Sequence, residues 1–171
     1  MAAAAVSRSS TIGADRPEAD GRTRLSFRNW VIGWKGKMLF YLYMTGNGVA
    51  VPGRCVGEGR FVRQMGPPGR FGVIELVLEP TKEPYGMCTL SWEVSESQIP
   101  LMFLDGVISA IKHVMSEGEF LGDCLHGTII RVVGGAYNQA DSKLSCYIMA
   151  TVIALRSALT EAGLYVPATA A

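Results

Sequence analysis

A glycine-rich turn followed by a strand decides the fold of this chain: residues 64–80 read QMGPPGRFGVIELVLEP. Over residues 71–79, apolar side chains such as Val73 and Leu76 alternate with polar ones such as Glu75. That period of two is typical of a strand with one buried face. The turn and the strand therefore predict a β-hairpin as the starting point of the domain.

Four further segments are predicted as strands. Residues 60–64 precede the turn and complete the hairpin, residues 88–94 alternate again, and residues 127–133 form a continuous β-branched run typical of a buried strand. Residues 38–44 are the longest apolar run and are flanked by glycines. At 7 residues this run is far shorter than a membrane-spanning helix, which needs about 18, so no membrane partner is expected.

Two helices are predicted after these strands. The first begins at Pro100 and ends at Gly118, and its apolar residues recur at spacings of three and four, which places them on one face. They are Leu101, Leu104, Ile108, Ile111 and Met115. The second spans residues 143–162, with Asp141 and Ser142 as expected N-cap residues. It is apolar almost all round, so we expect it to be buried between the sheet and the first helix or at a protein interface. The order β-β-β-α-β-α predicts a two-layer α+β domain.

Charge is distributed unevenly along the chain. The formal net charge of the whole chain is +1. Residues 1–72 carry 11 basic and 4 acidic side chains, whereas residues 73–171 carry 5 basic and 11 acidic ones. A basic half is compatible with phosphate groups or an acidic partner, and equally with neutralising the chain's own acidic half. With 49% hydrophobic residues, the chain can bury a substantial core.

The sequence favours a protein without catalytic, metal or cofactor chemistry. Its 4 cysteines form no CxxC pair, and Cys124 with His126 supplies too few ligands for zinc. Asp123 with His126 could move a proton, but no nucleophile accompanies them. No Gly-x-x-x-x-Gly-Lys-(Ser/Thr) loop is present, so we expect no GTPase activity and no bound GTP. No secretory signal is apparent, and free cysteines suit a reducing cytoplasm.

Two glycine-rich turns, residues 64–72 and 134–142, resemble those of domain IV of translation elongation factor G and its eukaryotic counterpart, elongation factor 2. The family patterns are Gln-x-Gly-Gly-x-Gly-x-(Tyr/Phe)-Gly and Gly-Ser-Tyr-His-x-x-Asp-Ser. Matching residues are Gln64, Gly66, Gly69, Phe71 and Gly72 in the first turn, and Gly135, Tyr137, Asp141 and Ser142 in the second. The register of the resemblance runs from about residue 56 to residue 163.

The resemblance implies a fold and a partner. The implied fold is a two-layer β-α-β sandwich, like domain 2 of some ribosomal proteins: a four-stranded sheet with both helices on one face and a left-handed crossover, an exception to the usual hand. In the family this domain reaches the ribosomal decoding site, and its tip loops touch transfer and messenger RNA. The implied partner is therefore the ribosome or a structured RNA. The residues expected to bind it are Arg63, Gln64, Gly66, Gly69, Arg70, Gly72, Tyr137, Asn138, Gln139, Asp141 and Ser142.

The tip also departs from the family pattern. Asn138 stands where the family has a histidine, and it cannot carry a positive charge. Pro67, next to Pro68, replaces a glycine, and neither proline has a backbone N–H to donate. Both a retained and a repurposed tip remain open.

We also consider two other hypotheses and a division of the chain. The chain could be a protein-interaction or homo-oligomerising module that uses its N-terminal extension and last helix, with no RNA role. It could also supply this domain in trans to a truncated GTPase. We expect a disordered tail at 1–23, an aromatic and basic extension at 24–55, the elongation factor G domain IV-like unit at 56–163, and a C-terminal tail at 164–171.

Overall fold

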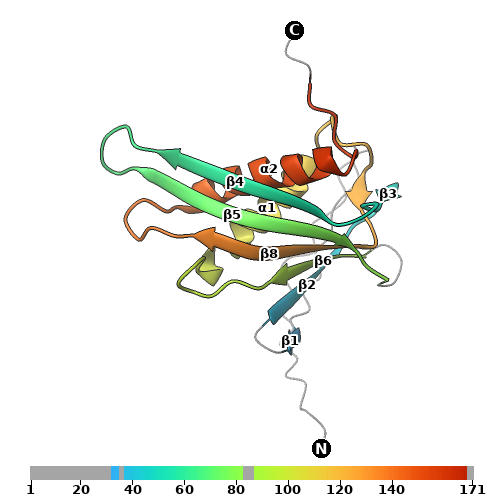
Figure 1. Ribbon diagram of the computed structural model, residues 1–171, viewed down its shortest axis with the longest axis horizontal. Coiled ribbons are helices and arrows are strands. Elements are labelled where there is room, and N and C mark those ends of the chain that lie inside the picture. Colours follow the sequence, from blue (N-terminus) through green and yellow to red (C-terminus); the bar gives the residue numbers. More distant parts are fainter. Residues whose placement is uncertain (1–31, 35–36, 83–86, 169–171) are drawn as a thin grey trace, which may run out of the picture.

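A mixed β-sheet forms one layer and two helices form the other (Figure 1). The computed structural model describes residues 32–34, 37–82 and 87–168. The strands are β1 (Ile32–Trp34), β2 (Lys37–Tyr43), β3 (Gly48–Val49), β4 (Cys55–Arg63), β5 (Arg70–Pro80), β6 (Met87–Trp92), β7 (Cys124–Leu125) and β8 (Thr128–Ala136). The helices are η1 (Leu101–Phe103), α1 (Leu104–Met115) and α2 (Leu144–Glu161).

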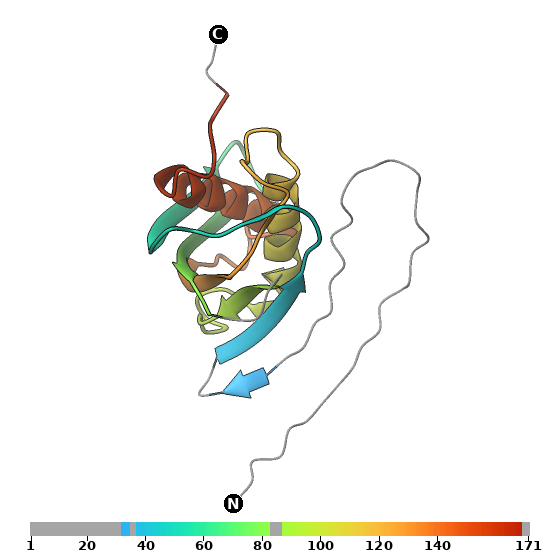
Figure 2. The ribbon, with the colours of Figure 1, turned by 90° about the vertical axis from the view of Figure 1, so that its right-hand side faces the viewer.

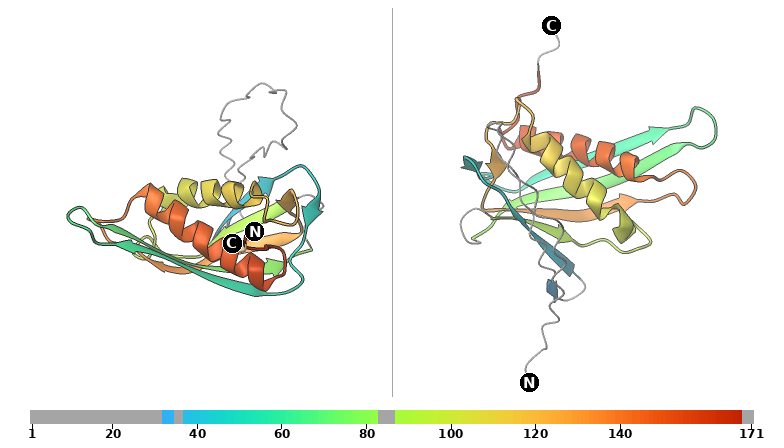
Figure 3. Two further views of the ribbon diagram at one scale, coloured as in Figure 1. Left: turned by 90° about the horizontal axis from the view of Figure 1, so that it is seen from above. Right: turned by 180° about the vertical axis from the view of Figure 1, so that it is seen from behind.

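The described sheet has 6 strands in the order β1-β2-β6-β8-β5-β4. Only β6 and β8 are parallel neighbours within it, and α1 lies on the connection between them. With the helices in front and these two strands pointing upward, β8 lies to the left of β6 (Figure 3, right panel). The crossover is therefore left-handed, as the family resemblance implied.

Helix α2 lies directly on the backbone of β4 at two glycines. A Cβ atom on Gly59 would lie 1.7 Å from the carbonyl oxygen of Ala150, and one on Gly57 would lie 1.9 Å from that of Ala154. No side chain fits in that space, so these glycines set the close approach of helix and strand. The largest fully buried side chains of this core include Ile74, Leu76, Leu78, Leu90, Trp92, Ile111, Ile130, Tyr147 and Leu155.

The length and composition of α2 would also suit a membrane span. It has 18 residues with a mean hydropathy of 1.2, but half of it is buried inside the fold. Its apolar residues pack on β4, β5 and α1, and this packing accounts for its composition. The predicted helix over 143–162 is therefore correct in its buried character. The predicted cap is wrong, because the N-cap residue is Lys143 and no side chain caps the helix.

The N-terminal extension contributes a strand to the sheet. β2 lies beside β6 (Figure 2) and pairs antiparallel with it along its length. The side chains of Phe40 and Leu42 are buried in the common core, as is that of Met44 just after the strand. The described sheet is therefore wider than the four strands expected for the domain. β2 covers the edge of β6, which would otherwise be exposed beside an apolar core. Residues 1–31 lie outside the described residues, so the predicted tail at 1–23 does too.

The first residues after Gly163 also pack on the body of the domain. Tyr165 forms a β-bridge with Phe120 and is only 7% exposed. Its hydroxyl donates to Glu117 Oε2 at 2.7 Å, and Glu117 also pairs with Arg156. The segment expected as a C-terminal tail therefore begins with residues anchored on the segment between α1 and β7.

Candidate functional site

Three loops meet at the end of the molecule that lies farthest from the β3–β7 pair (Figure 1). They are the β4–β5 turn (residues 64–69), the β8–α2 loop (residues 137–143) and the β6–η1 loop (residues 93–100). The first two contain the two glycine-rich turns, and we call them together the tip. The fold therefore brings the predicted site residues together, although they come from segments 72 positions apart in sequence.

Two arginines face each other at the base of the β4–β5 turn. Arg63 pairs directly with Arg70 in the antiparallel register, so both side chains lie on one face of the hairpin. Like charges directly opposite each other destabilise a sheet. Within the described residues neither guanidinium forms an ion pair, and that of Arg63 lies 5.3 Å from the Phe61 ring centroid. The hairpin thus carries a concentrated and unneutralised positive charge.

Two shallow hollows flank the turn, each of about 320 Å³. The basic hollow is lined by Arg63, Met65, Pro68 and Arg70. The Asp141 hollow is lined by Gln64, Gly66, Pro67, Gly69 and Asp141. Met65 is 92% exposed. Sequence reasoning missed Met65 and Pro68 as lining residues, although an apolar residue inside a turn of glycine and proline was a visible signal.

The β8–α2 loop is closed by its own hydrogen bonds. The side-chain oxygen of Asn138 accepts the N–H groups of Ala140 at 2.9 Å and Asp141 at 3.1 Å. The Ser142 hydroxyl accepts the N–H of Asn138 at 3.0 Å, and the N–H of Ser142 donates to the Asn138 carbonyl at 2.9 Å. An amide side chain therefore shapes the loop at the position where the family has a histidine.

Three hydrogen bonds join the β8–α2 loop to the β4–β5 turn and to the first residues of β5. The N–H of Gly69 donates to Asp141 Oδ1 at 2.9 Å, and the N–H of Phe71 donates to the Asp141 carbonyl at 3.1 Å. The hydroxyl of Ser142 donates to the Phe71 carbonyl at 2.8 Å. A Cβ on Gly69 would lie 3.0 Å from Asp141 Cγ, so a glycine here permits the close contact. The two loops form one hydrogen-bonded unit.

These contacts divide the predicted binding residues into two groups. The side chains of Arg63, Gln64, Arg70 and Gln139 are exposed, and no hydrogen bond within the described residues engages them. The side chains of Asn138, Asp141 and Ser142 are used within the tip, and the Tyr137 ring lies 5.7 Å from that of Phe103. Of the predicted glycines, Gly66 has a φ of +85°, and Gly72 lies under the backbone of Cys146.

Two prolines and two engaged amides reduce the number of backbone N–H groups that residues 64–71 can offer to an anion. The N–H groups of Gly69 and Phe71 are already bonded to Asp141, and Pro67 and Pro68 have none to offer. The exposed guanidinium groups of Arg63 and Arg70 are the cationic groups of this turn that a phosphate could meet.

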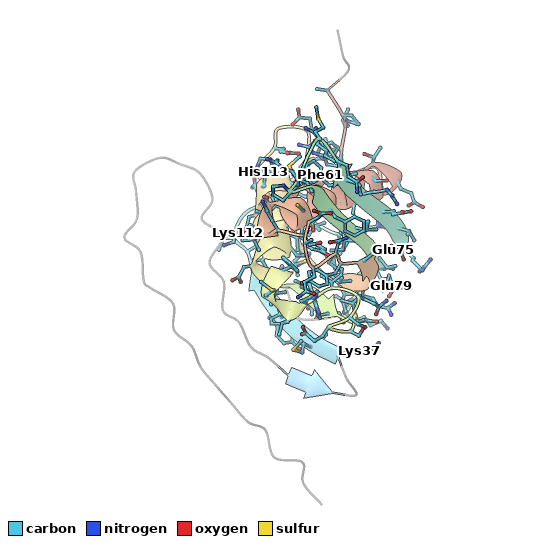
Figure 4. All side chains as sticks on the ribbon, turned by 90° about the vertical axis from the view of Figure 1, so that its left-hand side faces the viewer. Lys37, Phe61, Glu75, Glu79, Lys112 and His113 are labelled. Atoms are coloured by element: carbon cyan, nitrogen blue, oxygen red, sulfur yellow. The ribbon has the colours of Figure 1, made fainter. Side chains whose placement is uncertain are left out.

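The helix-free face of the sheet carries a different kind of charge cluster. Arg131 donates to Glu93 at 2.8 and 2.9 Å and lies 3.4 Å from Glu79, and Lys37 lies 3.2 Å from Glu93. The hydrogen bonds from Arg131 lower the pKa of Glu93 to about 2. Figure 4 shows Glu75 and Glu79 on this face, on the other side of the sheet from Lys112 and His113 of α1. The cluster is neutralised internally and links β2 to the central strands.

Several other reactive side chains of the described residues take part in contacts within the fold. Asp123 accepts the N–H of Asn47 at 2.7 Å at the end opposite the tip, and His113 lies 3.2 Å from Glu117. Burial raises the pKa of the thiols of Cys88 and Cys124. Among the described residues, no three His, Cys, Asp or Glu side chains are grouped so as to hold a metal ion.

Comparison with known proteins places this fold in a family. The family model described as elongation factor G, domain IV matches residues 53–163. An elongation factor G 2 from Desulfotalea psychrophila is 32% identical over 105 residues, which cover 61% of this chain and 15% of that protein. An elongation factor G from Dehalococcoides mccartyi is 26% identical over 113 residues, which cover 66% of this chain and 16% of that protein.

A solved structure agrees with these matches. A crystal structure of a protein from Thermus thermophilus is 25% identical, with a TM-score of 0.57, covering 66% of this chain and 16% of that one. The chain thus spans about one sixth of the length of the relatives that it matches. It belongs to the elongation factor G domain IV family, a family of translation elongation factor domains.

Proposed function

We propose that this chain binds the ribosome or a structured RNA through its tip and catalyses no reaction, as a cytoplasmic protein in translation that binds no GTP. The observation that carries the proposal is the Arg63–Arg70 pair. The two cations lie opposite each other with no ion pair in the described structure, at a cost in stability that a phosphate ligand would offset. Membership in a translation factor family supports RNA as the partner.

The tip suits RNA recognition by charge and side-chain contact. Arg63 and Arg70 would each meet a phosphate oxygen, since guanidinium groups bind phosphate in a bidentate manner. Met65, the most exposed large apolar side chain among the described residues, lines the same basic hollow and would contact a sugar or a base. Gln64 and Gln139 would supply neutral hydrogen bonds beside it.

Binding to ribosomal subunits and to ribosomal RNA across a salt series tests the proposal. The Arg63→Ala/Arg70→Ala variant should bind more weakly, and its slope of log affinity against log salt should be less steep by about 1.4 to 1.8, for two lost phosphate contacts. A charge-matched control is Arg60→Ala/Lys82→Ala, because both side chains are exposed and neither forms an ion pair among the described residues. An equal loss of RNA affinity in both double variants would contradict a specific role of the tip.

A protein-binding role of α2 is the second candidate. Leu144, Met149 and Ile153 are 44%, 43% and 40% exposed on this helix. The other apolar residues of α2 are largely buried in the chain's own core, as are those of β2, which leaves a smaller apolar surface than the sequence alone indicated. Light scattering at tens of micromolar tests self-association. A dimer that Ile153→Lys dissociates would support this role.

A further inference from the structure

We propose that Asp141 and Ser142 are positioning residues that do not contact RNA. They hold the β4–β5 turn against the β8–α2 loop, so that Arg63 and Arg70 are presented as a fixed pair. This inference rests on the proposed RNA-binding role of the tip. It differs from the sequence-based expectation, in which both residues bind the ligand themselves.

The β4–β5 turn lacks hydrogen bonds of its own. Pro67 and Pro68 have no N–H, and strand pairing ends at the Arg63–Arg70 pair, where two like charges repel each other. Among the described residues, the bond from the Gly69 N–H to Asp141 is the one hydrogen bond that ties residues 64–69 to another part of the chain. Without it, the turn would be held only at its base.

The hydrogen bonds of the two positioning residues to Gly69, Phe71 and Asn138 stay within the tip and the first residues of β5. Asp141 uses a side-chain oxygen for Gly69 and its main-chain carbonyl for Phe71. The hydroxyl of Ser142 donates to the Phe71 carbonyl and accepts from the Asn138 N–H, so its hydrogen is not available to a ligand. A carboxylate next to the turn would also repel phosphate. Holding the loops together therefore explains these residues better than direct contact does.

A preformed tip binds more tightly than a loose one, because ordering a loop on binding costs free energy. The contacts predict that loss of the Asp141 carboxylate frees the turn while leaving both arginines in place. Affinity then falls because the arginines must be ordered on binding. Replacement by asparagine keeps an oxygen acceptor for Gly69 and should preserve most of the order.

The test compares four variants in the full chain: Asp141→Ala, Asp141→Asn, Ser142→Ala and Ser142→Thr. The first readout is amide hydrogen exchange of residues 64–72, which needs no RNA. We expect faster exchange in Asp141→Ala and Ser142→Ala, near-parental exchange in the two conservative variants, and unchanged exchange in β6 and α1. The second readout is affinity for ribosomal RNA, which should fall about tenfold in Asp141→Ala and much less in Asp141→Asn.

Each outcome separates this inference from the proposed function. Unchanged exchange over residues 64–72 in Asp141→Ala would overturn the positioning role, whatever happens to RNA binding. An Asp141→Asn variant as weak as Asp141→Ala would show that the charge, not the acceptor, matters, and would also overturn it. Tighter binding in both Asp141 variants would overturn it too, in favour of simple repulsion of phosphate. Absence of RNA binding by the parent would overturn the proposed function, while the exchange data would still decide the positioning role.

Discussion

The side chain of Asp141 accepts the N–H of Gly69 at 2.9 Å, across 72 positions of sequence. This bond makes a single surface out of a hairpin turn and a strand–helix loop. Two further bonds, both to the backbone of Phe71, reinforce it. The charged residues of the tip are therefore presented on a support with its own hydrogen-bonding network.

The glycines of β4 should tolerate no side chain. In Gly59→Ala, the new Cβ would lie 1.7 Å from the backbone oxygen of Ala150, which cannot move without shifting α2. We expect a loss of unfolding free energy of at least about 3 kcal/mol, measured by urea denaturation. Gly53→Ala is the matched control, because nothing lies within 4 Å of its Cβ position, and it should change stability by less than about 0.5 kcal/mol.

Acid should destabilise the domain through Glu93. Its pKa in the folded protein is about 2, against an ordinary value of 4.5, because Arg131 binds the carboxylate. A lowered pKa contributes stability that is fully present above pH 4.5 and is lost as the pH falls toward 2. The contribution is on the order of 3 kcal/mol.

Thermal or urea unfolding between pH 7 and pH 2 measures this effect. The Glu93→Gln variant should be less stable at pH 7 and should show a flatter pH dependence. Glu75→Gln serves as the control, since Glu75 is exposed on the same face and forms no ion pair among the described residues. If the unfolding free energy of Glu93→Gln depended on pH as steeply as that of the parent, another carboxylate would govern the acid sensitivity.

The N-terminal extension should behave as part of the folding unit. Leu42 in β2, which pairs with β6, is fully buried, so Leu42→Ala should cost roughly 2–5 kcal/mol of unfolding free energy. Leu39 lies in the same strand but is only half-buried on the other face, so Leu39→Ala should cost under about 1.5 kcal/mol. Equal and small effects in chemical denaturation would show that β2 is dispensable for stability.

A histidine at position 138 should restore the family's charge but loosen the loop. The Asn138→His variant loses the oxygen that accepts the N–H groups of Ala140 and Asp141. We expect faster amide exchange over residues 137–143. Because an ordinary histidine has a pKa of about 6.5, RNA binding should become more salt-dependent at pH 5.5 than at pH 7.5. The Asn138→Asp control keeps an oxygen acceptor and should show the amide exchange of the parent. Faster exchange of the loop in this control would argue against a role of the side-chain oxygen in holding the loop.

Local pattern predicted the elements of this fold well. The alternation over residues 71–79 lies within β5. Of the predicted apolar stripe, Ile108, Ile111 and Met115 are buried, and Leu101 and Leu104 are partly buried against the core. These predictions succeeded because the side-chain periods of a strand and of a helix depend only on residues that are close together in sequence. The spacing of the two glycine-rich turns also pointed to the family before any fold was known. The hand of the crossover came only from that resemblance, since periodicity is the same for either hand.

The sequence by itself therefore determined the main strands and helices and the family. It did not predict the short strands β1, β3 and β7, and it predicted only the second half of β4. The tertiary structure alone decided what several of those residues do. Asp141 and Ser142 are residue types typical of a helix N-cap, yet their side chains bond to Gly69 in the β4–β5 turn and to Phe71 in β5, 72 and 71 positions away. Gly57 and Gly59 precede the strand predicted at residues 60–64, yet they belong to β4 and allow the close approach of the α2 backbone. A polar side chain finds its hydrogen-bond partner, and a glycine its packing neighbour, in a segment that is distant in sequence. Local sequence therefore cannot identify that partner or neighbour.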